Sequence, residues 1–68
     1  MLGDRVKEGR KKLGLTQQQL AKVTQISQGQ ISQLENGDIK EIETRRLKAL
    51  ARSLQVSADW LLELEPVS

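Results

Sequence analysis

Neither cysteine nor histidine occurs in this sequence of 68 residues, and this restricts the possible folds more than any other feature. A chain so short forms one domain at most and buries only about 60% of the surface that its unfolded form exposes. Small domains with thin cores often depend on disulfides, a metal or a partner subunit. The sequence excludes disulfides, thiolate and imidazole metal sites, and catalysis by cysteine or histidine. We therefore expect that the chain binds no metal or cofactor and is not an enzyme. We also expect a small domain that a partner subunit can stabilise.

The remaining composition favours helices. Leucine supplies 11 residues and glutamine 8, whereas Trp60 is the only aromatic residue. A β-rich domain would contain more tyrosine, phenylalanine, valine and threonine. The apolar runs are too short to cross a membrane, and no secretory signal opens the chain. We therefore expect no membrane partner and a soluble, intracellular protein.

Positive charge is concentrated in the first part of the chain. The net charge is +2, but residues 1–37 contain six Lys or Arg against three Asp or Glu, and the remainder contains five against six. An excess of positive charge favours a polyanion as partner, although an asymmetry this small is also typical of an ordinary solvated surface.

The first helix is predicted from about Asp4, a good N-cap residue, to Gly14, a typical helix stop. Its inward positions recur at helical spacing, and they are Leu2, Val6, Gly9 or Arg10, and Leu13. A glycine in mid-helix costs roughly 0.5–1 kcal/mol relative to alanine, so Gly9 is either a point of close packing or simply tolerated.

A second, short helix is predicted over Gln17–Val23. Thr16 precedes it and Gln19 follows three residues later, which is the capping-box pattern in which each side chain satisfies the other residue's backbone N–H. The expected inward residues are Leu20, Ala21 and Thr24.

A third helix is predicted over Gln28–Glu35, capped by Ser27 and ended by Asn36-Gly37, two residues that tolerate a left-handed backbone. Its expected buried stripe is Ile31 and Leu34. Two helices this short cannot bury their apolar faces alone, so the pair is expected to pack on other helices. The helix-turn-helix then spans about residues 16–36.

The C-terminal part is predicted to form two more helices within about residues 44–64, after a loop from Asp38 to Glu43. Thr44 is the expected cap of the fourth helix, and its inner face is Leu47, Leu50, Ala51 and Leu54. Ser57 opens a fifth helix that ends before Pro66. The sequence therefore predicts an all-α, five-helix single domain over residues 1–68.

The outward face of the third helix is rich in uncharged polar groups. If Ile31 and Leu34 point inward, the residues that point outward are Gln28, Gly29, Ser32 and Gln33. A glutamine amide offers a donor beside an acceptor, which matches the N6 and N7 edge of adenine in the major groove. Glutamines on an isolated helix are usually just surface, but within a capped helix-turn-helix they favour base reading.

The sequence resembles the Cro/C1-type (XRE-like) helix-turn-helix family from about Arg5 to Leu62. The residues that carry the resemblance are Arg5-Val6-Lys7, Arg10, Leu13-Gly14-Leu15, Gln17, Leu20-Ala21, Gln28, Ile31, Gln33–Gly37 and Val56–Leu62. The resemblance implies a lambda-repressor-like domain that binds a palindromic operator in double-stranded DNA as a homodimer, with the second helix of the motif in the major groove. It implies no small-molecule ligand, and a cytoplasmic, nucleoid-associated protein of a bacterium or phage.

The resemblance also implies roles for single residues. Gln28 and Gln33 match base-reading glutamines, and Gln17 matches a residue that braces Gln28 while it contacts a phosphate. Arg10 and Glu35 match a partly buried ion pair between the first and third helices. The expected phosphate-contacting residues are Gln17, Arg10, Thr16, Asn36 and Lys40.

Several positions depart from the pattern of this family. Gly29 stands where a phage repressor that the sequence resembles has glutamine, so base preference there is open. Glu41 and Glu43 replace basic residues near the minor groove, and Arg45 or Arg46 is the candidate replacement. In the broader family, glycine is usual at the position of Gln25, so the turn here requires a left-handed or altered backbone at a non-glycine residue.

A dimer interface is expected at Trp60, Leu61 and Leu64, with Leu62 and Val67 as further candidates. We expect the chain to dimerise only weakly when it is not bound to DNA.

Two classes of function remain open. The first is a sequence-specific transcriptional regulator, in the simplest case a repressor. The second is an antitoxin or protein-interaction module that also binds DNA, which an adjacent toxin gene and a co-purifying second chain would favour.

Overall fold

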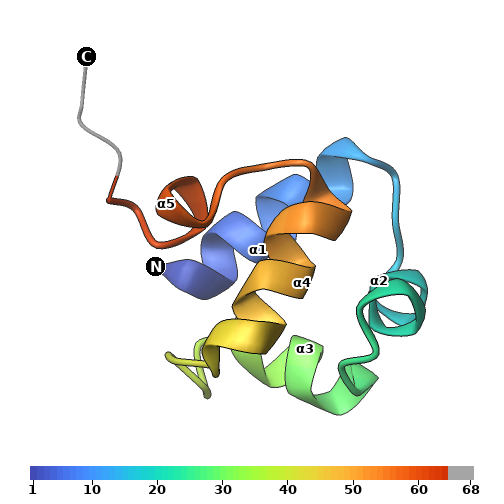
Figure 1. The fold of residues 1–68 in the computed structure, drawn as a ribbon. Coiled ribbons are helices and arrows are strands. Elements are labelled where there is room, and N and C mark those ends of the chain that lie inside the picture. Colours follow the sequence, from blue (N-terminus) through green and yellow to red (C-terminus); the bar gives the residue numbers. More distant parts are fainter. Residues whose placement is uncertain (65–68) are drawn as a thin grey trace.

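Five α-helices follow one another along residues 1–64, the part of the chain that the structure, a computed structural model, describes (Figure 1). They are α1 (Leu2–Lys12), α2 (Gln17–Thr24), α3 (Gln28–Asn36), α4 (Thr44–Leu54) and α5 (Ala58–Leu61). The all-α, five-helix architecture predicted from the sequence is confirmed. None of the helices in residues 1–64 is long and apolar enough to cross a membrane. The expectation for Val67 lies outside the described residues.

Short-range capping signals fix the starts of three helices. At α2, the Gln19 N–H donates to Thr16 Oγ1 at 3.0 Å and the Thr16 N–H donates to Gln19 Oε1 at 2.8 Å, which completes the predicted capping box. Ser27 accepts from the Gln30 N–H at 3.1 Å, and Ser57 accepts from the Trp60 N–H at 3.0 Å. These serine caps were also predicted.

The starts of α1 and α4 differ from the sequence prediction. The chain enters α1 at Leu2, so Asp4 lies in the first turn, where its carboxylate faces the positive end of the helix dipole. Glu43, rather than Thr44, is the N-cap residue of α4 and makes no side-chain cap. Leu13 lies just beyond α1 and is exposed, so the apolar stripe of α1 ends one turn earlier than predicted.

The fifth helix is shorter than the sequence indicates. It ends because Glu63 adopts a left-handed backbone with φ 58°, which lets the Leu64 N–H donate to the Asp59 carbonyl at 2.8 Å and the Glu63 N–H to the Trp60 carbonyl at 3.1 Å. A non-glycine residue rarely adopts this backbone conformation. The Met1 α-amine, 2.8 Å from Glu63 Oε1, holds Glu63 in place, and the sequence gives no local sign of that contact.

All five helices contribute to the core. The fully buried large side chains are Val6, Leu20, Ile31, Leu34, Leu50 and Leu61, and the other buried core residues are Leu2, Ile26, Ala51 and Leu54. Figure 1 shows α4 in the middle of the view, with α1 crossing behind it and α3 below, near its lower end. The core therefore supports α3 from behind and leaves its opposite face to solvent.

Helix α1 approaches α3 most closely at Gly3. A Cβ built there would lie 1.8 Å from the carbonyl oxygen of Leu34, so only glycine fits. Gly9 faces Leu54 of α4, where a Cβ would lie 3.4 Å from the nearest side-chain atom, an ordinary packing distance. The close helix contact considered for Gly9 is therefore made at Gly3 instead.

Candidate nucleic-acid interface

The turn between α2 and α3 sets the angle of the helix-turn-helix. Gln25 adopts a left-handed backbone there, with φ 61°. A left-handed or altered backbone was expected from the sequence at this non-glycine residue. The buried Thr24 hydroxyl donates to the Leu20 carbonyl at 2.7 Å and accepts from the Ile26 N–H at 3.3 Å. These bonds join the last turn of α2 to the turn and satisfy polar groups that are buried from water.

The exposed face of α3 contains the residues predicted to read bases. Ile31 and Leu34 are buried, so the opposite side of α3 points away from the core. Gln28, Gly29 and Gln33 are exposed, and Ser32 is half-buried. A Cβ at Gly29 would meet nothing within 4 Å, so packing within the chain does not require glycine there. The face therefore carries amide and hydroxyl groups and no charge.

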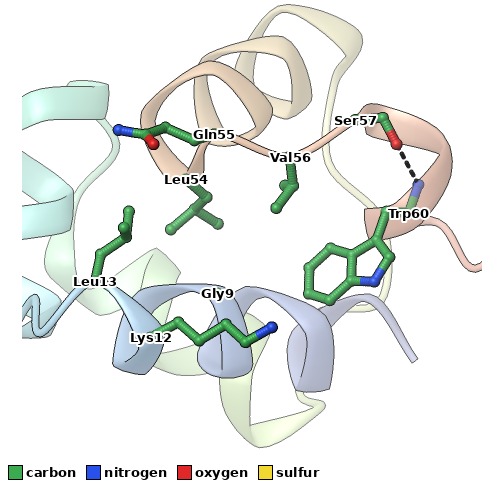
Figure 2. Close-up of a pocket in the computed structure, with 8 residues that line it drawn as sticks. All are labelled: Gly9, Lys12, Leu13, Leu54, Gln55, Val56, Ser57 and Trp60. Carbon is green, nitrogen blue, oxygen red and sulfur yellow. Dashed lines mark hydrogen bonds between the residues drawn. The ribbon is translucent and has the colours of Figure 1, made fainter.

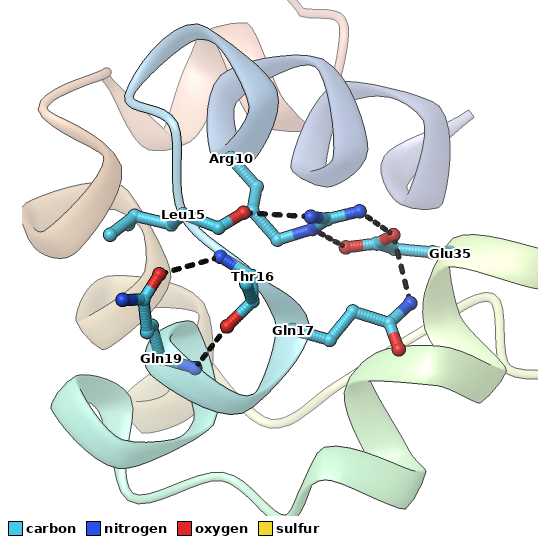
Figure 3. A network of polar contacts seen from close by, with 6 residues as sticks. All are labelled: Arg10, Leu15, Thr16, Gln17, Gln19 and Glu35. Carbon is cyan, nitrogen blue, oxygen red and sulfur yellow. Dashed lines mark hydrogen bonds and ion pairs between the residues drawn. The ribbon is translucent and has the colours of Figure 1, made fainter.

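An ion pair joins α1 to the C-terminal half of α3 (Figure 3). Arg10 donates from Nε to Glu35 Oε2 at 2.8 Å and from NH2 to Glu35 Oε1 at 3.0 Å, and from NH1 to the Leu15 carbonyl at 2.8 Å. The Glu35 side chain is only 2% exposed and that of Arg10 11%. The hydrogen bonds that Arg10 donates to Glu35 raise the pKa of Arg10 above its already high ordinary value. The expected ion pair is present, and three of the five N–H groups of Arg10 are used within the chain.

Gln17 lies beside this ion pair. Its side-chain amide donates from Nε2 to Glu35 Oε1 at 3.1 Å, as Figure 3 shows. The sequence-based expectation placed the brace of Gln17 on Gln28, whereas the structure places it on Glu35. The contact spans 18 positions in the chain, and no local pattern indicates it. The start of α2 and the end of α3 are thereby tied to the same carboxylate.

The capping box leaves two backbone donors at the start of α2. Within residues 1–64 the N–H groups of Thr16 and Gln19 are satisfied by each other's side chains, and that of Leu20 by the Thr16 carbonyl. The N–H groups of Gln17 and Gln18 are left to face solvent at the positive end of the helix dipole. Such a pair of donors suits an anion such as a phosphate.

Arginines of α4 lie along the other side of α3. Arg46 donates from NH1 to Gln30 Oε1 at 2.8 Å, and its Nε lies 3.3 Å from Glu43 Oε1. Arg45 is 90% exposed and reaches the same carboxylate oxygen only at 3.7 Å. The sequence analysis identified these residues as candidates but missed the partner, Gln30. After α3, Asn36 and Lys40 are both exposed, as their predicted phosphate roles require.

The helix-turn-helix family model matches residues 6–61. The chain belongs to this family. Members of this Cro/C1 (XRE) group of helix-turn-helix proteins are DNA-binding domains, not enzymes. The search of curated proteins finds no match.

Two solved helix-turn-helix structures are similar to the chain over almost all of its length. The biofilm master regulator SinR, solved in complex with DNA, is 27% identical, with 91% of this chain and 98% of that chain covered and a TM-score of 0.88. The P22 c2 repressor, solved with synthetic operator 9T, is 35% identical, with 96% and 97% covered and a TM-score of 0.87. These similarities establish the lambda-repressor-like fold.

Proposed function

We propose that this protein is a sequence-specific transcriptional regulator, acting as a repressor that binds a palindromic operator as a dimer. The observation that carries the proposal is the uncharged, amide-rich face of α3, held outward on a scaffold similar to domains solved in complex with DNA. Within the family, the sequence also resembles the DNA-binding domain of the phage 434 repressor, which supports the same mode of binding.

In this proposal, α3 enters the major groove and its glutamines read base edges. Gln28 and Gln33 are exposed and carry paired donors and acceptors, which suit adenine. Ser32 can donate to or accept from either kind of base. The open position at Gly29 lets the helix backbone approach a base pair closely. The ion pair and the Gln17 contact at Glu35 support α3 from one flank of its buried stripe.

The phosphate contacts flank α3 at both ends. At the start of α2, the N–H groups of Gln17 and Gln18 and the Thr16 hydroxyl would hold one phosphate. After α3, Asn36 and Lys40 would hold another. We assign Arg10 a structural role alone, because its guanidinium is 11% exposed and engaged by Glu35 and Leu15.

Arg45 is the candidate for the basic contact that the family pattern places near the minor groove. The Glu43 carboxylate is adjacent to both Arg45 and Arg46, so its negative charge is partly neutralised before DNA binds. Arg46 is engaged with Gln30 and Glu43, whereas Arg45 is almost fully exposed. The exposed guanidinium of Arg45 can reach a phosphate beside the minor groove without breaking a contact with α3.

We place the dimer surface around Trp60. Leu61 is fully buried in the core of a single chain, so its side chain is not available to a second copy, contrary to the sequence-based expectation. Trp60 instead lines an open cavity of about 440 Å³ with Leu13, Leu54 and Val56 (Figure 2). Leu13 is exposed beside it, and a second copy would bury this apolar surface.

Two substitutions separate base reading from phosphate binding. Gln33→Ala should weaken the selected operator by about 1–3 kcal/mol and relax preference at one base pair, because a bidentate contact is lost. Lys40→Gln should weaken all duplexes alike and lower the salt slope by about one unit. Titrations of labelled duplexes at several salt concentrations measure both the loss of affinity and the salt slope. Equal losses on operator and unrelated DNA for Gln33→Ala would contradict base reading by α3.

A further inference from the structure

Helix α3 is held from both flanks by arginines of different helices. Gln30 and Glu35 lie five positions apart, which at 3.6 residues per turn places them about 140° apart around the helix axis, on either side of the buried stripe. Arg10 of α1 binds Glu35 on one flank, and Arg46 of α4 binds Gln30 on the other. The two contacts oppose rotation of α3 in opposite directions.

The hydrogen bond between Arg46 and Gln30 has a defined donor and acceptor. A guanidinium has donors only, so the amide oxygen of Gln30 must face Arg46, at 2.8 Å from NH1. The Gln30 amide is then left with its N–H donors, so it does not offer the free donor and acceptor pair that reads adenine. Arg46 is itself held in place, because its Nε lies 3.3 Å from the Glu43 carboxylate at the start of α4.

We propose that Arg46 is a specificity-determining positioning residue that, with Arg10, fixes the rotation of α3 and hence the base pairs that Gln28 and Gln33 meet. The inference rests on the proposed DNA-binding function. Rotation matters because side chains extend about 5–6 Å from a helix axis, so a turn of about 10° moves their tips by roughly 1 Å. Hydrogen bonds tolerate only about 0.5 Å in length. A loosened α3 would therefore discriminate less among bases while it still binds DNA.

Arg45 offers a matched control for the charge. It precedes Arg46 in the first turn of α4 and approaches the same Glu43 oxygen, at 3.7 Å. Its side chain is 90% exposed, against 44% for Arg46, and the contact with Gln30 belongs to Arg46. Arg45→Gln and Arg46→Gln therefore remove the same charge from the same place, but only the second releases α3.

The experiment measures Kd for the selected operator and for every single base-pair change in it. The proteins compared are wild type, Arg45→Gln, Arg46→Gln, Gln30→Ala and the Arg46→Gln/Gln30→Ala double variant. Alanine variants of Gln28 and Gln33 identify the base pairs that each reads. Thermal melts by circular dichroism establish that every variant is folded at the temperature of the titrations.

We expect Arg45→Gln to weaken all duplexes by the same factor and to keep the wild-type order of preference. Arg46→Gln should lower discrimination by roughly 3- to 10-fold at the base pairs read by both Gln28 and Gln33, the effect of losing about one hydrogen bond. Gln30→Ala should do the same, and the double variant should add nothing further, because both substitutions remove one contact.

The outcomes separate two failures. If wild type selects no sequence, the proposed function fails and the inference falls with it. If wild type selects an operator but Arg46→Gln has the same preference profile as Arg45→Gln, only the inference fails. A change confined to one base pair outside those of Gln28 and Gln33 would also overturn it, because Gln30 would then be a base reader that Arg46 orients. Additive effects of Arg46→Gln and Gln30→Ala would overturn it as well.

Discussion

Gly3 of α1 packs directly against the backbone of Leu34 in α3, at a distance that excludes any side chain. A Cβ at Gly3 would lie 1.8 Å from the Leu34 carbonyl oxygen and 3.1 Å from the Cα of Glu35. Backbone atoms cannot move aside as a flexible side chain can. This contact sets how closely the helix proposed to read DNA lies to the rest of the domain.

Gly3→Ala should therefore destabilise the fold by about 1–3 kcal/mol or more, because α1 and α3 must separate to admit the methyl group. Gly9→Ala is the matched control: its Cβ would meet Leu54 Cδ1 at 3.4 Å, and the removal of a mid-helix glycine should gain roughly 0.5–1 kcal/mol. Urea denaturation followed by circular dichroism measures both. A neutral Gly3→Ala variant would show that α1 and α3 do not pack this closely.

Arg10 and Glu35 should behave as a coupled pair. Arg10→Met alone leaves a carboxylate that is 2% exposed without its cation, and we expect a loss near the lower end of the roughly 3–5 kcal/mol typical of a broken buried pair. Adding Glu35→Leu removes the orphaned charge and should recover part of the loss. A double-mutant cycle in urea measures the coupling. Additive losses would mean that the two side chains contribute independently.

The ion pair between the Met1 α-amine and Glu63 should make stability depend on pH. The hydrogen bond between them raises the pKa of the amine and lowers that of Glu63. The contribution of the amine is complete below its ordinary pKa and is lost as pH rises through the raised value in the folded chain. The contribution of Glu63 is complete above its ordinary pKa and is lost as pH falls through the lowered value.

Glu63→Gln should therefore lower Tm most between about pH 5 and 7.5, within the window between the two ordinary pKa values. The difference from wild type should shrink in acid, and it should shrink only in part in alkali, because Arg5 Nε remains 3.5 Å from Glu63 Oε1. Thermal melts across pH 3–10 provide the measurement. A difference in Tm that does not vary with pH would exclude the ion pair as its cause.

Gln25→Gly should stabilise the turn by up to about 1 kcal/mol. Gln25 occupies the left-handed region with φ 61°, where a side chain costs roughly 1–2 kcal/mol and the extra backbone entropy of glycine offsets part of the gain. Gln18→Gly, in the first turn of α2, should instead lower the free energy of unfolding by an amount approaching 1 kcal/mol. Opposite signs for these two glutamine-to-glycine changes are the expected result, and equal signs would contradict the assigned turn geometry.

Helix caps that depend on residues close together in the chain were predicted from the sequence. Side-chain partners that lie far apart in the chain were missed. The capping box at Thr16 and the serine caps are local hydrogen bonds with a fixed spacing, so the pattern alone identifies them. Glu63, at the end of α5, pairs with Met1, which is more than 60 positions away in the chain. The partners of Gln17 and Arg46 depend on how α3 packs on its neighbours, and spacing within a helix carries no such information.

Selection of bound duplexes from a randomised pool tests the central claim most directly. The proposal predicts an enriched palindrome whose half-sites lie about one helical turn apart, bound by two copies of the chain. Gln33→Ala should relax the base preference at one symmetric position of each half-site. A pool that remains random after repeated rounds, with wild-type protein shown to be folded, would contradict sequence-specific recognition by this helix-turn-helix.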